Sequence, residues 1–328
     1  AIYWVGAALV ESIARTDMAG RLTMFTNVLV FSTYATYVVM SFMMLAMIFM
    51  LLPQAQVSAE RINEVLDEEI DITDGPSDAA VESGSIDFED VCFSYTRDPD
   101  KLALRHVTLH IASGETIGVI GGTGSGKSTL VQLLLSFRLP TEGQILFDGV
   151  QASRIDRGVI RKNISCVLQK TAVYSGTIRH NIEMGRPGAA EAEILEAADI
   201  AQLTPFLSSL PERLEHPLQQ SGKNLSGGQK QRLCIARAIL KDAPIYVFDD
   251  SFSALDFLTE ANLRRSLNEK IQGKTQIVIT QRITSAMNAD HIFVMDRGRL
   301  VDDGVHAELL SRCKTVSYTH LRAHETSQ

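Results

Sequence analysis

The sequence predicts two unlike parts: a helical membrane segment, followed by an α/β domain built on a mostly parallel sheet. Two observations support this fold class. No charged side chain occurs from Leu22 to Ala59, and a membrane helix needs about 20 apolar residues. Farther along, short β-rich runs alternate with helical runs, as in ETIGVIG followed by KSTLVQLLLS. This alternation is typical of parallel strands joined by helical crossovers.

The composition excludes some functions. With a formal net charge of −8 over 328 residues, the chain offers a nucleic-acid partner no electrostatic attraction. The cysteines lie far apart without CxxC or His-flanked spacing, so we expect small buried hydrophobes in a reducing compartment rather than metal ligands. They are Cys92, Cys166, Cys234 and Cys313.

The chain divides into four segments. Residues 1–66 are predicted to be the C-terminal end of a membrane domain. A charged turn separates two apolar runs, which indicates about one and a half membrane helices. Residues 67–84 are rich in acidic side chains and include DGPSD, which predicts a solvated linker. Residues 85–314 form the α/β domain.

Both ends of the chain are expected to be incomplete or foreign. The chain starts inside an apolar helix, so we expect its beginning to be missing. The C-terminal VSYTHLRAHET matches the translation of a common transposase sequencing adapter, so residues 315–328 are interpreted as a non-native tail. A genuine polar tail is the alternative.

One face of the membrane helix is rich in methionine. Met40, Met43, Met44 and Met47 recur at helical spacing. They either pack against neighbouring helices or form an adaptable surface facing a substrate pathway, and the sequence leaves both readings open.

A phosphate-binding loop opens the first helix of the α/β domain. The segment GGTGSGKST fits G-x-x-x-x-G-K-[ST] and lies between the strand Thr116–Ile120 and a helix, the context that makes the motif specific. Its residues are Gly121, Gly122, Thr123, Gly124, Ser125, Gly126, Lys127, Ser128 and Thr129. Glycines let backbone N–H groups surround the phosphates of ATP, Lys127 should reach the β- and γ-phosphates, and Ser128 should ligate Mg²⁺.

A carboxylate follows a buried strand farther along. Ile245–Phe248 are all apolar or aromatic and precede Asp249. Many buried strands end in aspartate, but downstream of a phosphate loop this one is expected to hold Mg²⁺, directly or through water.

A second anion site is predicted in the segment LSGGQ. Ser226, Gly227, Gly228 and Gln229 lie at the start of a helix, where backbone N–H groups attract anions. A chain with one phosphate loop has no need of a second site unless it completes a site on another chain.

With this segment the chain resembles the ABC ATPases, and the resemblance covers roughly residues 86–310. In that family two such domains sandwich two ATPs, each between the phosphate loop of one chain and the LSGGQ of the other. The resemblance implies that Tyr95 stacks on adenine and that Gln169 contacts Mg²⁺. It also places Asp256, in the segment SALD, at the dimer interface.

The N-terminal part looks like the end of an exporter-type membrane domain. The resemblance therefore implies an integral membrane protein of the plasma (inner) membrane, with the ATP-binding domain in the cytoplasm.

Two positions depart from the family pattern. Active members usually carry Glu after the Asp of the buried strand and His in the later switch loop, whereas this chain has Asp250 and Gln281. Asp is shorter than Glu, and Gln cannot change protonation state. A positioned general base contributes about 10²–10⁴ in rate. The chain therefore resembles the hydrolytically impaired half of a heterodimeric exporter, whose intact LSGGQ completes the partner's site.

Alternative functions remain. A homodimeric exporter with a variant catalytic site is the runner-up. A soluble ABC ATPase of DNA repair or translation is disfavoured by the uncharged run. The expected partners are a second exporter half, the lipid bilayer, and a small-molecule, lipid or peptide substrate that the sequence does not identify.

Overall fold

A computed structural model describes residues 1–68, 74–75, 81–96 and 98–313. The chain divides into two units, Ala1–Asp71 and Ile72–Gln328. The expected tail at 315–328 and much of the expected linker lie outside the described residues, so their assignment stays a prediction.

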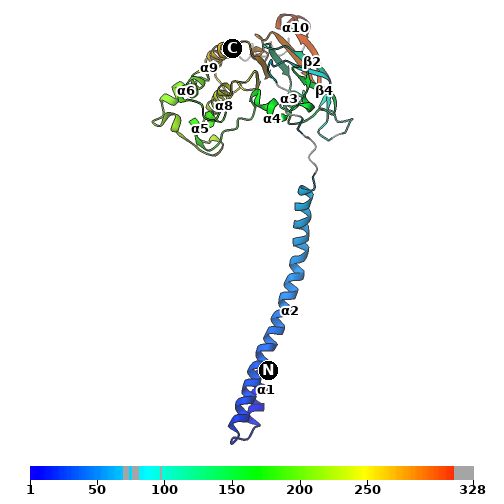
Figure 1. Cartoon of the computed structure of the whole chain (residues 1–328), viewed down its shortest axis with the longest axis vertical. Coiled ribbons are helices and arrows are strands. Elements are labelled where there is room, and N and C mark those ends of the chain that lie inside the picture. The colour runs from blue at the N-terminus through cyan, green and yellow to red at the C-terminus, as the bar shows by residue number, and fades with distance from the viewer. Residues whose placement is uncertain (69–73, 76–80, 97, 314–328) are drawn as a thin grey trace. The chain divides into compact units, whose positions relative to one another are not determined.

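The first unit is a helical pair (Figure 1). Helix α1 (Ile2–Glu11) packs against the early turns of α2 (Met18–Leu66). The contact is close because Gly6 has no side chain: a Cβ there would lie 2.4 Å from Val28 Cγ1. Ser32 also donates its hydroxyl to the Tyr3 hydroxyl at 3.1 Å.

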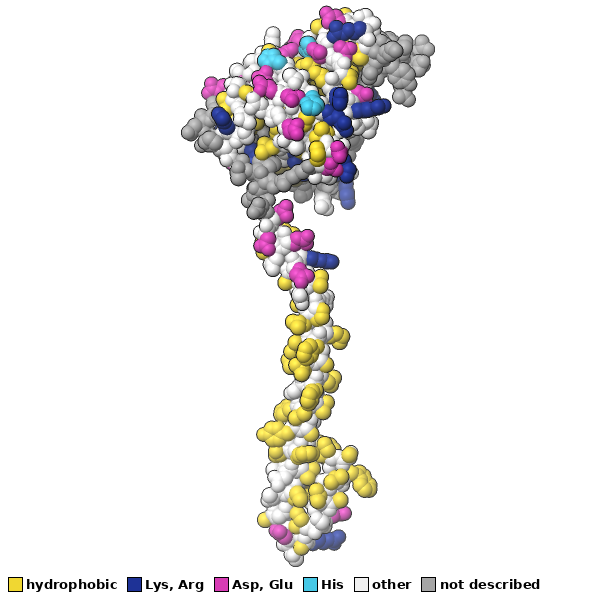
Figure 2. Space-filling model, turned by 90° about the vertical axis from the view of Figure 1, so that its right-hand side faces the viewer, with side chains coloured by type: hydrophobic (Ala, Val, Ile, Leu, Met, Phe, Trp, Pro, Cys, Tyr) yellow, Lys and Arg dark blue, Asp and Glu magenta, His cyan; other side chains and the backbone are white. Residues whose placement is uncertain are grey.

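Helix α2 is suited to an apolar medium. Among the described residues it is the one helix long and apolar enough to cross a membrane. Its hydroxyl side chains, such as Thr26 and Ser41, donate to the carbonyl four residues earlier, so these polar groups are satisfied without water. Between its charged ends, apolar side chains cover its surface (Figure 2), and Met40, Met43, Met44 and Met47 are all exposed.

The second unit contains a six-stranded sheet in the order β12-β11-β3-β10-β9-β6. Strands β11, β3, β10, β9 and β6 run parallel, and β12 is antiparallel to β11. Their bounds are β3 (Thr116–Gly121), β6 (Ile164–Val167), β9 (Ile245–Asp249), β10 (Thr275–Thr280), β11 (His291–Asp296) and β12 (Arg299–Gly304). The largely parallel sheet expected from the sequence is confirmed, with an antiparallel edge.

An antiparallel sheet in the order β2-β1-β4-β5 packs beside it. Its strands are β1 (Ile86–Phe93), β2 (Leu104–Ile111), β4 (Glu142–Phe147) and β5 (Val150–Gln151). One hydrophobic core joins the two sheets to α3 (Lys127–Leu134), with Phe88, Phe147, Ile117 and Leu133 almost fully buried. This core fixes the position of the loop between β3 and α3.

The remaining helices include a lobe formed by α5, α6 and α8 (Figure 1). The helices are α4 (Arg157–Lys162), α5 (Ile178–Glu183), α6 (Glu191–Ile200), α7 (Thr204–Ser208), α8 (Gly227–Lys241), α9 (Phe257–Lys270) and α10 (His306–Arg312), and β7 (Gly176–Thr177) pairs with β8 (Pro217–Leu218). Short 3₁₀ turns lie at Ala152–Arg154, Arg213–Glu215, Gln220–Gly222 and Ile283–Ser285. The predicted fold class, an apolar helix followed by a mixed-sheet domain with a helical part, is confirmed.

Candidate functional site

The candidate site lies where neighbouring parallel strands end. In a parallel sheet all carboxyl ends meet at one edge, which is where α/β domains bind ligands. The loop Gly121–Gly126 follows β3, Gln281 follows β10, Asp249 ends β9, and Gln169 comes two residues after β6. The strand order therefore brings together residues that are more than 150 positions apart in the sequence.

These strand ends surround a cavity of about 410 Å³. The predicted site residues among its lining are Thr123, Gly124, Ser125, Gly126, Lys127, Ser128, Thr129, Gln169, Asp249, Asp250 and Gln281. The loop, the strand-end carboxylates and the switch position thus share one cavity. The volume lies within the range of ordinary small-molecule sites.

The glycines determine the backbone shape of the loop. Gly124 and Gly126 have φ of +78° and +103°, values that other residues rarely adopt. A Cβ at Gly126 would lie 2.7 Å from Leu104 Cδ2, whereas one at Gly122 or Gly124 would meet nothing within 4 Å. The loop is therefore tight where it packs on the core and open elsewhere, as backbone N–H groups that approach phosphate require.

Lys127 lies within the same loop. Its Nζ donates to the carbonyl oxygens of Gly121 at 2.6 Å and Gly122 at 2.8 Å. Burial lowers the pKa of Lys127, and the carboxylates of Asp249 and Asp250 act in the opposite direction. A half-buried cation beside the open part of the loop makes this side of the cavity complementary to an anion.

Asp249 provides the carboxylate expected for Mg²⁺. It is 7% exposed. Burial and the neighbouring carboxylate of Asp250 raise its pKa, while Lys127 and a backbone hydrogen bond from Gln169 lower it. A buried carboxylate whose ionised form is disfavoured gains stability from a cation.

The oxygen donors in the cavity fit Mg²⁺. Mg²⁺ prefers oxygen ligands and commonly uses one or two carboxylates together with substrate phosphates and waters, and Asp249, Ser128 and Gln169 line the same cavity. Among the residues that the structure describes, no group of three or more His, Cys, Asp and Glu could hold a metal ion by itself. The donor set therefore suits a metal that arrives with phosphates.

Asp250 has an unusual backbone. Its φ is +47°, and its N–H donates to the Ile279 carbonyl at 2.8 Å. Burial raises the pKa of its carboxyl, opposed by Arg282, Lys127 and a hydrogen bond from Ser253. Asp250 and Gln281, the two departures noted in the sequence, both line the cavity.

The LSGGQ segment begins α8 and lies apart from the cavity lining in the described part of the chain. Ser226 accepts the N–H of Gln229 at 3.2 Å and donates its own N–H to the Gln229 side chain at 2.8 Å. This reciprocal cap leaves Ser226 and Gly227 exposed. Among the described residues, the exposed part of the segment therefore lies outside this chain's own cavity, and its service to a second chain stays a prediction.

The segment containing Asp256 lies beside α8. A Cβ at Gly228 would lie 3.0 Å from the Ala254 carbonyl oxygen. Asp256 itself caps α9 by accepting the Thr259 N–H at 2.9 Å, which lowers its pKa. The structure thus places Ala254, two residues before Asp256, against the first turn of α8.

Tyr95 lies next to the cavity through Thr129. Its hydroxyl is within hydrogen-bond distance of Thr129 Oγ1 at 3.1 Å, and its ring packs edge-on against Phe93. The side chain is 52% exposed, so a face of the ring is open to solvent. Stacking on adenine stays a prediction.

Some lining residues had no signal in the sequence. They are Leu102, Ala103, Ile279, Thr280, Arg297 and Gly298. Arg297 and Gly298 follow β11, which pairs with β3. Knowing that β11 runs parallel beside β3 would have pointed to Arg297 and Gly298. The order of strands in the sheet, however, is not readable from the sequence.

The chain is similar to known ABC transporter proteins. Residues 104–253 match the family model described as ABC transporter. The chain is 38% identical over 310 residues to the uncharacterized ABC transporter ATP-binding protein YfiB of Bacillus subtilis, covering 94% of this chain and 52% of that protein. It is 37% identical over 287 residues to the ATP-dependent lipid A-core flippase of Saccharophagus degradans, covering 88% and 49%.

A solved structure agrees over most of the chain. The structure of a bacterial Atm1-family ABC exporter with ATP bound superposes with a TM-score of 0.78 at 32% identity, covering 92% of this chain and 52% of that one. The chain spans about half the length of the curated relatives it matches.

Proposed function

Since the chain carries the ATP-binding domain of an ABC transporter with exporter-type relatives, we propose that it is one half of an exporter driven by ATP. The observation that supports this most is the shared cavity, in which the glycine loop, Lys127, Asp249 and Gln169 come together. A nucleotide with Mg²⁺ satisfies both the cationic loop and the buried carboxylate.

Each group in the cavity has a definite part in binding. The N–H groups of the loop and Lys127 hold the β- and γ-phosphates. Ser128, Asp249 and Gln169 hold Mg²⁺, which neutralises phosphate charge when bound. Tyr95 stacks on the base. Asp250 and Gln281 face the end of the phosphate chain where water attacks.

The hydrolytic residues favour a chain whose own site turns over slowly. Asp250 is one methylene shorter than Glu, so it positions an attacking water less well. The Gln281 amide donates a hydrogen bond but does not exchange a proton. Losing a positioned base slows hydrolysis by about 10²–10⁴. Binding residues are retained, which separates nucleotide binding from turnover.

The position of LSGGQ supports a two-chain assembly. Ser226 and Gly227 are exposed and outside the cavity lining of the described residues, so they serve the nucleotide of a second half. With an impaired cavity and an intact LSGGQ, the chain suits a heterodimer in which the partner hydrolyses most of the ATP.

A homodimer is the second candidate, and one observation favours it. Burial raises the pKa of Asp250, which brings the carboxylate closer to the basicity useful for accepting a proton at neutral pH. In that case the same Asp250 would act in both sites.

The apolar helix supports a membrane location. Helix α2 spans the plasma (inner) membrane, with the ATP-binding domain in the cytoplasm, where ATP is. The cargo is a small molecule, a lipid or a peptide; the flippase among the relatives makes a lipid one reasonable choice.

The test uses the chain in membranes. After a carbonate wash the chain should stay in the membrane fraction, and Lys127→Ala should abolish binding of a fluorescent ATP analogue. Lys101→Ala is the control, since Lys101 is an exposed lysine paired with Asp98 outside the cavity. Release by carbonate would reject the membrane assignment, and equal binding by both variants would reject the nucleotide site.

A further inference from the structure

Arg297 occupies a position equivalent to the other cavity residues. It is the first residue after β11, which runs parallel to β3 with Met295 paired to Gly121. A residue within two positions after each of β3, β10, β9 and β6 lines the cavity, and so does Arg297. The strand next to the phosphate loop therefore also contributes a side chain at the carboxyl edge.

The turn carrying Arg297 is fixed to the phosphate loop. The next residue, Gly298, donates its N–H to the Ser125 carbonyl at 3.0 Å and accepts the Arg105 N–H at 2.7 Å. A Cβ at Gly298 would lie 2.5 Å from the Ala103 carbonyl oxygen. Arg297 is thus held within one residue of a backbone contact to the loop itself.

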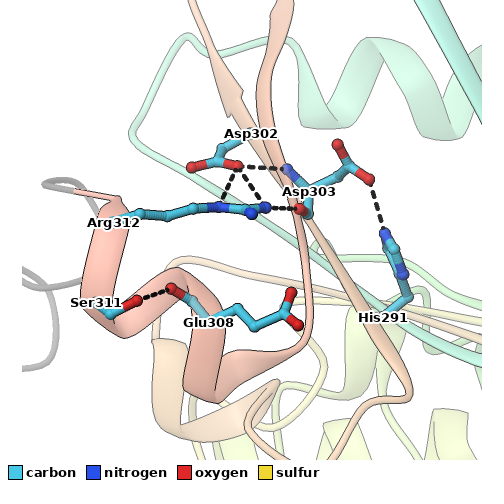
Figure 3. A network of polar contacts seen from close by, with 6 residues as sticks. All are labelled: His291, Asp302, Asp303, Glu308, Ser311 and Arg312. Carbon is cyan, nitrogen blue, oxygen red and sulfur yellow. Dashed lines mark hydrogen bonds and ion pairs between the residues drawn. The ribbon is translucent and has the colours of Figure 1, made fainter.

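Polar contacts brace the strands behind this turn (Figure 3). His291 Nε2 lies 3.0 Å from Asp303 Oδ2, across the β11–β12 pair. Arg312 of α10 contacts Asp302 at 3.1 Å and the Asp303 carbonyl. The hairpin is held at its open end by these contacts and at its turn by Gly298, so the position of Arg297 is restrained.

The turn also carries a residue that its geometry does not favour. Asp296 pairs with Arg299, so Arg297 and Gly298 form a two-residue hairpin turn with φ of +46° and +78°. Such turns prefer Asn, Asp or Gly at the first position. Asparagine would suit the backbone better than arginine.

The charges in the cavity explain what the arginine adds. Lys127 and Arg297 are the cationic side chains among its described lining, against the carboxylates of Asp249 and Asp250. The Lys127 ammonium is already surrounded by loop carbonyls. A nucleotide's phosphate chain carries several negative charges, and a guanidinium forms charge-assisted hydrogen bonds with phosphate oxygens.

We propose that Arg297 is a nucleotide-binding residue that contacts the phosphate chain from the side of the cavity opposite Asp249. This inference rests on the proposed nucleotide site. Arg299 lies on the same hairpin, two residues away, but outside the cavity lining of the described residues. It is the matched control for charge near the site without contact.

The experiment compares Arg297→Asn with Arg299→Asn in the full chain in detergent micelles. Displacement of a fluorescent ATP analogue by Mg-ATP gives the affinity. Arg297→Asn should raise Kd about threefold to tenfold, the scale of one partly solvated charge-assisted contact. Arg299→Asn should leave it unchanged. Adenosine, which lacks phosphate, should compete equally well against all three proteins.

A second measurement avoids variants. Phenylglyoxal modifies exposed arginines, and peptide mass spectrometry identifies them; Mg-ATP should protect Arg297 and leave Arg299 reactive. Equal affinities of the two variants, a loss that extends to adenosine, or no protection of Arg297 would each overturn the proposal. Failure of the nucleotide site itself looks different, since the unaltered chain would then bind no Mg-ATP.

Discussion

The side-chain oxygen of Gln231 accepts the backbone N–H of Ala254 at 3.0 Å. Gln231 is one turn into α8 and is buried, while Ala254 belongs to the segment that leads to Asp256. The same glutamine donates toward Ser253 Oγ at 3.4 Å. One side chain therefore joins the exposed LSGGQ to the segment expected at the dimer interface, and the two should move together.

Replacing this glutamine should destabilise the fold. Gln231→Leu keeps the approximate size but leaves the Ala254 N–H without its partner, at a cost of about 1–3 kcal/mol. Denaturant unfolding of the second unit measures it. Gln272→Leu is the control, because Gln272 is exposed and should change stability by less than about 0.5 kcal/mol. Equal losses in the two variants would contradict the bridging role.

Adding one methyl group should affect the tightly packed part of the phosphate loop differently from the open part. Gly126→Ala puts a Cβ 2.7 Å from Leu104 at a φ of +103°, so backbone strain and overlap should cost about 1–3 kcal/mol. Gly122→Ala meets nothing within 4 Å and should leave stability nearly unchanged. Its added methyl should instead weaken ATP binding, because it projects from the loop that is expected to surround the phosphates. Thermal unfolding and nucleotide titration of both variants test this, and a stable Gly126→Ala would count against the geometry.

The buried carboxylate should cost stability in the absence of Mg²⁺. The folded-state pKa of Asp249 is raised, so folding is favoured while the group is protonated. That advantage is fully present below its ordinary pKa of 3.8 and is lost as pH rises through the folded value. At pH 7 in EDTA, Asp249→Asn should therefore be more stable than the unaltered chain, because the ionised carboxylate is then buried without a cation.

Two controls test whether the carboxylate of Asp249 causes this difference in stability. The difference between Asp249→Asn and the unaltered chain should shrink as pH falls toward 4, because both are then neutral at this position. Mg-ATP should stabilise the unaltered chain and have much less effect on the variant. A variant that is less stable than the unaltered chain at pH 7 in EDTA would show that the carboxylate is stabilised by the fold rather than strained by it.

Local patterns predicted the fold well where they are strong. The apolar run predicted the helix found as α2. The strand before the glycine loop was expected at Thr116–Ile120 and is found at Thr116–Gly121. The strand Ile245–Asp249 ends at the aspartate singled out from the sequence. Such elements depend on residues close together in the chain, so periodicity and turn chemistry suffice to locate them.

Other features depend on which strands are neighbours. Arg297 enters the cavity because β11 pairs with β3 across more than 170 residues, and nothing near Arg297 in the sequence specifies that pairing. The capping role of Asp256 and the hydrogen bonds of Tyr95 likewise depend on tertiary contacts. Sequence motifs therefore predicted which side chains carry the chemistry, whereas strand order determines which groups meet.

The division of labour between two unlike chains is tested by two substitutions in the full-length protein with its partner. Asp250 lines this chain's own cavity, whereas Ser226 is exposed outside it. In a heterodimer, Asp250→Asn should therefore reduce steady-state ATP hydrolysis little, because the cavity it affects contributes little turnover. Ser226→Arg should remove most of it, since a bulky cation would block the anion site over the partner's nucleotide.

A homodimer predicts a different result from the same pair of variants. Every catalytic site would then contain Asp250, so neutralising it should lower the rate by about 10²–10⁴, as severely as damage to LSGGQ. Leu225 is buried beside Ser226, so thermal unfolding of Ser226→Arg must match the unaltered chain before its rate is compared. With folding matched, equal losses from Asp250→Asn and Ser226→Arg would reject the heterodimer and favour the homodimer. A loss confined to Ser226→Arg is the outcome that two unlike sites require, because only then does this chain serve its partner's nucleotide more than its own.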